Sequence, residues 1–299
     1  MTGAGPSKGS YAVEFRNVSI AFDERAALVD VSFKLRSGAM IILTGESGSG
    51  KSVLMRLAMG LEKPDAGEIL INGRNISSLG ESDLLAIRGG LMGMVFQEDS
   101  LFTGLSVYDN VAYRLEEHGW SEEDTDKAVN EVLRFVGLDG EDKKLPEELS
   151  GGMKRRLEIA RALVGWPSIM LFDEPTMSLD PIVALQVLDL VIRARDINHI
   201  SSIYVTKKPM EIPYLAGYVA RGRDKGIVVV KASAEELPDT TIIVLEKGRI
   251  VFIGSLTSFE SSDLPSVRRI ITLDPHHDAL DVYFKDPWDK TRLANEKLL

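Results

Sequence analysis

The sequence predicts an α/β fold with a mainly parallel central sheet. Short apolar, β-branched runs such as 169–172 and 201–205 alternate with segments of helical spacing, and a helical stretch from about 98 to 165 interrupts the alternation. This pattern is typical of a parallel sheet covered by helices. The sequence contains no internal repeat and no run of coiled-coil heptads.

The composition excludes several classes of protein. The 299 residues are 44% hydrophobic, and the net charge of −10 argues against a protein that binds nucleic acid through bulk positive charge. Without cysteine the chain has neither disulfides nor thiolate metal ligands. The N-terminus lacks the apolar segment of a signal peptide, and no run reaches the roughly 18 apolar residues of a membrane span. We expect any membrane-spanning part to belong to another chain.

The first third of the chain predicts strands, one hairpin and one helix. Alternation of apolar residues indicates antiparallel strands over 12–22 and 27–35. The run 39–45 predicts a short buried strand, and the helical spacing of 53–61 predicts a helix after it. Asn72-Gly73 between two apolar runs is a strong signal for a hairpin.

The rest of the chain alternates between helices and strands. Ser121 with Asp124 resembles a helix-capping pair, Gly137 suits the end of that helix, and Ser150 is placed to cap the next one. The later strands are expected over 168–172, 201–205, 227–230, 241–245 and 248–254, with a helix over 181–195.

Residues 45–52, GESGSGKS, match the phosphate-binding pattern G-x-x-x-x-G-K-[ST]. Glycines let backbone N–H groups turn toward phosphate oxygens, and the next helix adds its dipole. We expect Lys51 to reach the β- and γ-phosphates and the Ser52 hydroxyl to bind Mg²⁺. The alternative is an ordinary glycine turn. The loop residues expected to bind the nucleotide are Gly45, Glu46, Ser47, Gly48, Ser49, Gly50, Lys51 and Ser52.

The strand 169–172 ends in two carboxylates, Asp173 and Glu174. A phosphate-binding loop of this kind works with an acidic strand end that holds Mg²⁺, which is the role we expect for Asp173. Glu174 is placed to accept a proton from an attacking water. Two acids at a solvent-exposed strand end, without a chemical role, are the alternative.

A third motif separates families. Residues 149–156, LSGGMKRR, place a serine and two glycines at a helix start, which is a second anion-binding geometry. With the two motifs above, and in this order, it resembles the signature of the ABC-type ATPases. The resemblance implies a P-loop NTPase with a RecA-like core, an N-terminal antiparallel β subdomain and an inserted helical subdomain. It also implies ATP and Mg²⁺ as cofactors.

The resemblance assigns further residues. Phe22 stands where the family has an aromatic that stacks on adenine, and Gln97 where a glutamine touches Mg²⁺ and faces the membrane partner. Asp180 ends a stretch that matches the loop after the catalytic glutamate. In this family two copies close head to tail, so each signature helix contacts the ATP of its partner. The signature residues expected to do so are Ser150, Gly151 and Gly152.

A finer resemblance concerns the stretch 91–119 and Met153, the residue after the signature glycines. Both are similar to the ATPase subunit of Mla/MCE-type phospholipid transporters. This resemblance implies phospholipid cargo, and integral-membrane permease subunits and an MCE-type substrate-binding protein as partners. It also implies a peripheral place on the cytoplasmic side of the bacterial inner membrane. A plain helical surface over 98–113, rather than one that faces the permease, is the alternative.

These motifs also suggest domain boundaries. The expected parts are a flexible tail, an ABC ATPase domain and a C-terminal extension, over 1–11, 12–271 and 272–299. The domain divides into a core over 12–96 and 166–271 and a helical subdomain over 97–165, with an extra edge insertion at about 221–239. The aromatic residues of the extension either grip a neighbouring subunit or pack on their own chain; these are Tyr283, Phe284 and Trp288.

Lys207 departs from the family. At the end of the strand after the catalytic glutamate the family has a histidine that touches the γ-phosphate, and Lys207 stands there in the context YVTKK. Lysine only donates hydrogen bonds, whereas neutral imidazole both donates and accepts, and a fixed cation weakens Glu174 as a base. We expect ATP binding to survive and hydrolysis to be the step at risk. The alternative is a solvated lysine without a role. The positions of the four histidines in the sequence do not allow any of them to replace it. They are His118, His199, His276 and His277.

Three functions remain open. The first is the ATP-binding subunit of a bacterial ABC transporter, with a second copy and a permease as partners. The second is a subunit that binds ATP as a clamp and barely hydrolyses it. The third, a soluble ABC protein of DNA repair or translation, is disfavoured by the single set of motifs, the short helical insert and the acidic composition.

Overall fold

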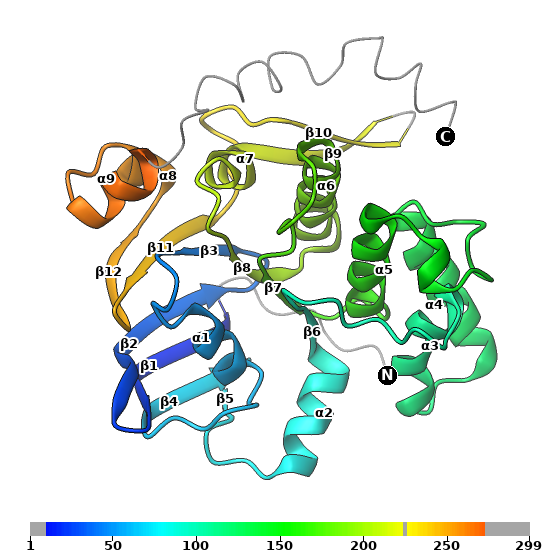
Figure 1. Cartoon of the computed structure of the whole chain (residues 1–299), viewed down its shortest axis with the longest axis horizontal. Coiled ribbons are helices and arrows are strands. Elements are labelled where there is room, and N and C mark those ends of the chain that lie inside the picture. The colour runs from blue at the N-terminus through cyan, green and yellow to red at the C-terminus, as the bar shows by residue number, and fades with distance from the viewer. Residues whose placement is uncertain (1–9, 224–225, 273–299) are drawn as a thin grey trace.

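A six-stranded sheet forms the centre of the molecule in the computed structural model, which describes residues 10–223 and 226–272 (Figure 1). The four pairings from β11 to β6 are parallel, whereas the edge strand β12 pairs antiparallel with β11. The predicted mainly parallel sheet is therefore confirmed. The strands lie in the order β12 (Arg249–Gly254), β11 (Thr240–Glu246), β3 (Met40–Thr44), β8 (Ser201–Val205), β7 (Ile169–Asp173) and β6 (Met92–Val95).

An antiparallel sheet formed by the first strands lies beside this centre. Its order is β2 (Arg25–Arg36), β1 (Tyr11–Phe22), β4 (Ala66–Ile71) and β5 (Arg74–Asn75). The predicted hairpin joins β4 to β5 through Asn72 and Gly73, whose φ angles of 47° and 78° suit a type I′ turn. The predicted antiparallel strands and the predicted hairpin are thus both confirmed.

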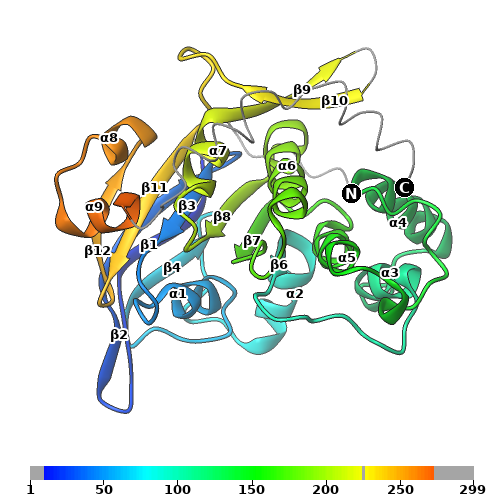
Figure 2. The ribbon, with the colours of Figure 1, turned by 45° about the horizontal axis from the view of Figure 1, so that its top comes forward.

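Helices cover both faces of the central sheet (Figure 2). One face carries α1 (Lys51–Ala58) and α2 (Glu81–Leu91), and the other carries α6 (Pro181–Asn198) and α7 (Glu211–Gly217). After β12 the chain forms α8 (Leu256–Glu260) and α9 (Pro265–Thr272). Among the described residues no helix combines the length and apolar character that crossing a membrane requires.

Each central strand contributes to two hydrophobic cores, because side chains alternate across a sheet. Met40 and Ile42 of β3 lie in the core that also holds residues of α6 and α7. Ile41 and Leu43 of the same strand lie in the core shared with α1, α2 and the antiparallel sheet. The sheet is thereby buried on both sides, which explains why its strands are continuous apolar runs.

The helical segment forms a cluster of its own beside the core (Figure 1). It consists of α3 (Val107–Glu117), α4 (Glu122–Phe135), a 3₁₀ turn (Pro146–Glu148) and α5 (Gly151–Leu163). The predicted caps are present: the Ser121 Oγ accepts the Asp124 N–H at 3.2 Å, and the Ser150 Oγ accepts the Met153 N–H at 3.3 Å. These caps fix where α4 and α5 begin.

The insertion expected near 221–239 forms a separate hairpin of β9 (Tyr218–Arg223) and β10 (Gly226–Lys231). It makes a two-stranded sheet of its own rather than an edge of the six-stranded sheet. Helix α6 holds its first strand, since Asp196 Oδ2 accepts the Ala220 N–H at 2.7 Å and Arg195 donates to the Tyr218 carbonyl at 2.7 Å. The tail over 1–9, the aromatic residues of the extension, His276 and His277 lie outside the described residues.

Arg114 of α3 joins the helical cluster to the core. Its guanidinium donates to the carbonyl oxygens of Ala162, Gly89 and Met92 at 2.9, 3.0 and 2.7 Å. These carbonyls belong to the end of α5, to α2 and to the start of β6. One partly buried cation therefore satisfies acceptors from three elements.

We predict that Arg114→Met lowers the free energy of unfolding by about 3 kcal/mol, because buried carbonyls lose a charged donor. Urea denaturation followed by circular dichroism measures the change. The control is Arg134→Met on the exposed side of α4, which should shift stability by less than about 0.5 kcal/mol. Similar losses in the two variants would contradict the role given to Arg114.

Candidate functional site

The phosphate-binding loop joins β3 to α1, as its motif predicts. Gly45 and Gly50 have φ angles of 142° and 106°, which side-chain-bearing residues rarely adopt. A Cβ at Gly45 would lie 2.1 Å from the carbonyl oxygen of Leu245, and one at Gly50 would lie 2.6 Å from that of Ala27. Gly48, with φ at 75°, faces open space. The loop is packed tightly at its two ends and leaves room for a phosphate at its middle.

Lys51 lies buried at the start of α1 with its ammonium turned into the loop. Its Nζ donates to the carbonyl oxygens of Gly45 and Glu46 at 2.7 and 2.8 Å and to the Ser49 Oγ at 3.2 Å. Burial, followed by repulsion from Lys207, lowers the pKa of Lys51 to about 8. A phosphate would offer this ammonium charged oxygens in place of neutral ones.

Asp173 at the end of β7 is buried, and its Oδ1 has no hydrogen-bond partner. Burial and the neighbouring charge of Glu174 raise the pKa of Asp173, whereas a hydrogen bond from Ser52 lowers it. A buried carboxylate oxygen without a partner, beside a serine hydroxyl, is a donor set that fits Mg²⁺. The third expected ligand, Gln97, donates from Nε2 to the Met177 Sδ at 3.1 Å.

Glu174 and Lys207 form an ion pair at the ends of β7 and β8. The Lys207 Nζ lies 2.7 Å from Oε1 of Glu174. Glu174 has a φ of 50°, in the left-handed region, and its N–H donates to the Val205 carbonyl at 3.1 Å. The carboxylate side chain is 10% exposed and the lysine side chain 38%, so Lys207 remains accessible to a ligand. Lys207 is thus ion-paired rather than free in solvent.

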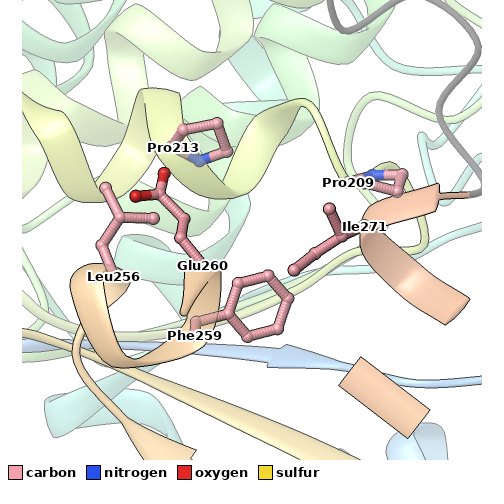
Figure 3. Close-up of a pocket in the computed structure, with 6 residues that line it drawn as sticks. All are labelled: Pro209, Pro213, Leu256, Phe259, Glu260 and Ile271. Atoms are coloured by element: carbon pink, nitrogen blue, oxygen red, sulfur yellow. The ribbon is translucent and has the colours of Figure 1, made fainter. Parts of the chain in front are cut away.

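Two pockets lie near this ion pair. The first, of about 250 Å³, borders the phosphate-binding loop and Lys207, and its lining residues are Thr44, Gly45, Glu46, Ser47, Lys207, Pro209 and Ile270. The second, of about 320 Å³, shares Pro209 with it and lies between α7, α8 and α9 (Figure 3). Its other lining residues are Pro213, Leu256, Phe259, Glu260 and Ile271. Apolar side chains and one carboxylate make the second pocket unsuitable for phosphate.

The remaining expected residues lie in other parts of the chain. Phe22 ends β1 and is 39% exposed. Ser150 and the glycines after it begin α5, where a Cβ at Gly152 would lie 2.7 Å from the Val183 side chain. Asp180 caps α6 by accepting two N–H groups of its first turn at 3.1 Å. Within one chain the signature belongs to the helical cluster and the phosphate-binding loop to the core (Figure 1).

The sequence alone did not reveal how α5 holds the loop that carries Gln97. Arg155 donates to the Gln97 carbonyl at 3.2 Å, and Arg161 to the Ser100 carbonyl at 2.7 Å. Glu158 accepts the Ser100 N–H at 3.0 Å, and burial raises the pKa of Glu158 to about 7. Arg155, Glu158 and Arg161 recur at helical spacing, and this pattern in the sequence could have indicated that they act together.

A second missed group surrounds Glu211 of α7. Its carboxylate accepts hydrogen bonds from Thr176 and Thr206, whose neighbours Glu174 and Lys207 form the ion pair. Lys208 also reaches the same loop, donating to the Thr176 carbonyl at 2.7 Å. Lys208, the second lysine of YVTKK, is the feature of the sequence that could have indicated this group.

The lowered pKa of Lys51 predicts how binding of MgATP depends on pH. Phosphate binds the charged ammonium, and in the free protein Lys51 loses its proton as the pH rises through about 8. We expect affinity to be greatest below about pH 8 and to fall above it. Lys207→Met removes a repelling charge, so the fall should begin at higher pH.

Isothermal titration calorimetry between about pH 7 and pH 10 measures both curves. Phosphate buffers are avoided, since they compete for the loop. An affinity that stays constant over this range, or a Lys207→Met curve that moves to lower pH, would contradict the charge balance described for Lys51.

Comparisons with known proteins agree with this geometry. The profile of the family described as "ABC transporter" matches residues 28–177, half of the chain. The methionine import ATP-binding protein MetN of Corynebacterium jeikeium is 37% identical over 258 residues, 84% of this chain and 64% of the relative. The protein trigalactosyldiacylglycerol 3, chloroplastic, of Arabidopsis thaliana is 35% identical over 268 residues, 87% of this chain and 73% of the relative. The chain thus spans less than two thirds of the length of the first relative.

A solved structure gives the same result. The ATP-binding cassette MJ0796, in a dimeric post-hydrolysis state bound to ADP and Pi, superposes with a TM-score of 0.68 at 26% identity, covering 82% of this chain and 98% of the other. These matches do not support the expected assignment to Mla/MCE-type transporters in particular. They do settle the family and the P-loop fold. The chain belongs to the ABC transporter family, as an ATPase cassette whose cofactors are ATP and Mg²⁺.

Proposed function

We propose that the chain is the ATP-binding subunit of an ABC transporter, working with a separate permease at the membrane and with a second copy of itself. The observation that carries this proposal is the convergence of Lys51, Asp173, Glu174 and Lys207 beside one phosphate-binding loop. The signature residues lie in the helical cluster, so one chain presents two incomplete halves of a nucleotide site. A head-to-tail pair of copies completes both.

In this proposal the residues divide the work of hydrolysis. Lys51 and the loop N–H groups hold the β- and γ-phosphates, and Phe22 stacks on the adenine. Ser52, Asp173 and Gln97 would hold Mg²⁺, which when bound neutralises phosphate charge. Glu174 takes a proton from the water that attacks the γ-phosphorus, while the bond to the β-phosphate oxygen breaks. The signature residues Ser150, Gly151 and Gly152 reach the ATP of the partner copy.

Lys207 gives this mechanism its own character. Its ammonium cannot accept a hydrogen bond, and it is paired with the carboxylate that must act as base. The γ-phosphate is a stronger anionic partner than Glu174, so Lys207 exchanges one for the other when ATP enters. Glu174 is then free for water. If the ion pair persists instead, the subunit is a clamp that binds ATP and barely hydrolyses it, which is the second candidate function.

Two cargo classes compete. Methionine is supported by the names of several relatives, including MetN of Corynebacterium jeikeium and of Leifsonia xyli, the latter 35% identical over 87% of this chain. Phospholipid is the expectation from the stretch 91–119, and the Arabidopsis thaliana relative carries the name of a glycolipid. We favour methionine-type import, because more of the relatives carry that name. An MCE-type partner belongs to the phospholipid alternative.

The proposed movement of the Lys207 ammonium from Glu174 to the γ-phosphate predicts a measurable rate of ATP hydrolysis. In the complex purified with its membrane partners, the chain should hydrolyse ATP clearly faster than its Glu174→Gln variant, which keeps the fold but lacks the base. Lys207→His should hydrolyse at least as fast as the unchanged chain. Phosphate release at saturating MgATP measures all three. Turnover equal to that of Glu174→Gln, in a complex shown to bind ATP, would establish the clamp.

Transport in proteoliposomes separates the two cargoes. We expect ATP-dependent uptake of labelled methionine by the reconstituted complex with its binding protein, and none with Glu174→Gln. A labelled phospholipid that moves between leaflets under the same conditions, with no methionine uptake, would reverse the assignment in favour of lipid.

A further inference from the structure

The buried carboxylate of Glu211 lies directly behind the Glu174–Lys207 ion pair. Glu211 opens α7, the helix that follows the Lys207 loop, and is only 2% exposed. Its two oxygens serve different loops. Oε1 accepts the hydroxyl of Thr176, whereas Oε2 accepts the hydroxyls of Tyr204 and Thr206 at 2.9 and 2.7 Å.

The positions of these hydroxyls tie the carboxylate to both partners of the ion pair. Thr176 stands two residues after Glu174, and Thr206 immediately precedes Lys207. One side chain therefore fixes the loop that carries the base and the loop that carries the cation. The distance of 2.7 Å between Lys207 and Glu174 depends on both loops being held at once.

The backbone of Glu174 makes such a restraint necessary. A non-glycine residue with a φ of 50° is strained, and it keeps this conformation only when its surroundings enforce it. Lys208 adds to the enforcement, because its Nζ donates to the Thr176 carbonyl at 2.7 Å and its N–H donates to the Thr206 Oγ1 at 2.9 Å. The two consecutive lysines thus reach the same loop, one at Glu174 and the other at Thr176.

Hydrogen bonds from neighbouring side chains compensate the burial of the Glu211 carboxylate. Burying a charge is costly unless hydrogen bonds compensate, and here three hydroxyls donate while the Lys208 ammonium lies 3.9 Å away. Burial, with the charge of Glu211, raises the pKa of Tyr204 well above its ordinary value, so its hydroxyl remains a donor. The opposite side of α7 presents Pro213 to the pocket in Figure 3.

We propose that Glu211 is a positioning residue that places the Lys207 ammonium for the γ-phosphate, and so sets the preference of the site for ATP over ADP. This inference rests on the proposed function, because it assumes that Lys207 meets the γ-phosphate. Glu211 is buried, and its carboxylate is hydrogen-bonded to hydroxyl groups of the protein. It acts through Thr206 on Lys207 and through Thr176 on Glu174.

The test compares affinities for MgADP and for the non-hydrolysable Mg-AMP-PNP by calorimetry on the full chain. We expect Glu211→Gln to weaken AMP-PNP binding about tenfold, the loss that one hydrogen bond to a charged group supports, and to leave ADP binding within about twofold. Lys207→Met should produce the same selective loss. Combined with Lys207→Met, Glu211→Gln should add nothing further, because both changes disable the same cation.

Glu14→Gln is the matched control. Glu14 is also a buried, ion-paired glutamate, but it lies in β1 of the antiparallel sheet with Arg16 and Lys34 as its partners. It should leave both affinities unchanged. Should Glu211→Gln fail to fold, Thr206→Val removes the hydrogen bond between Glu211 and the loop that carries Lys207, and it should show the same selective loss at about threefold.

Equal weakening of ADP and AMP-PNP, or losses that add in the double variant, would overturn the positioning role and leave Glu211 as a stabiliser of the fold. Failure of the proposed function looks different. In that case the unchanged chain binds neither nucleotide, or Lys207→Met leaves the preference between them unaltered.

Discussion

The functional site depends on the parallel register of β3, β8 and β7. Val205 of β8 pairs with Leu43 on one side and with Asp173 on the other. Adjacent strands lie about 4.8 Å apart, so the residues that follow these three positions leave the sheet together. They are the phosphate-binding loop, Thr206 with Lys207, and Glu174. A shift of one residue in either pairing would turn the following side chains to the opposite face and separate Glu174 from Lys207.

Charge is balanced at this edge of the sheet by specific partners. Lys207 serves Glu174, hydroxyls and Lys208 serve Glu211, and Lys51 is held by carbonyl oxygens of its own loop. Asp173 differs, because one of its buried oxygens has no partner. In a site where the neighbouring carboxylates are satisfied, an unsatisfied oxygen beside a serine hydroxyl is where a divalent cation gains most.

Local patterns in the sequence predicted the sheet, the caps and the phosphate-binding loop, since each depends on neighbours along the chain. Tertiary contacts decided the rest. Helix α2 was not predicted because Gly89 and Gly90 are poor helix formers, yet a Cβ at Gly89 would lie 1.5 Å from the His118 ring. No pattern in the sequence distinguishes Glu211, because its partner Thr176 is distant in sequence. For the same reason no motif predicts the hydrogen bond between Gln97 and Met177.

The lysine at position 207 changes which interactions Glu174 makes. A neutral imidazole would leave Glu174 without an ionic partner, whereas Lys207 gives it one at 2.7 Å in a partly buried setting. In the proposed mechanism ATP must break this pair to recruit the cation, and loss of the γ-phosphate allows the pair to form again. Part of the attraction between Lys207 and ATP is therefore spent on separating the pair, while ADP binding leaves it intact. As ATP is converted to ADP, the Lys207 ammonium moves between a phosphate and the Glu174 carboxylate. Because Glu211 restrains both loops, the distance of this movement stays small.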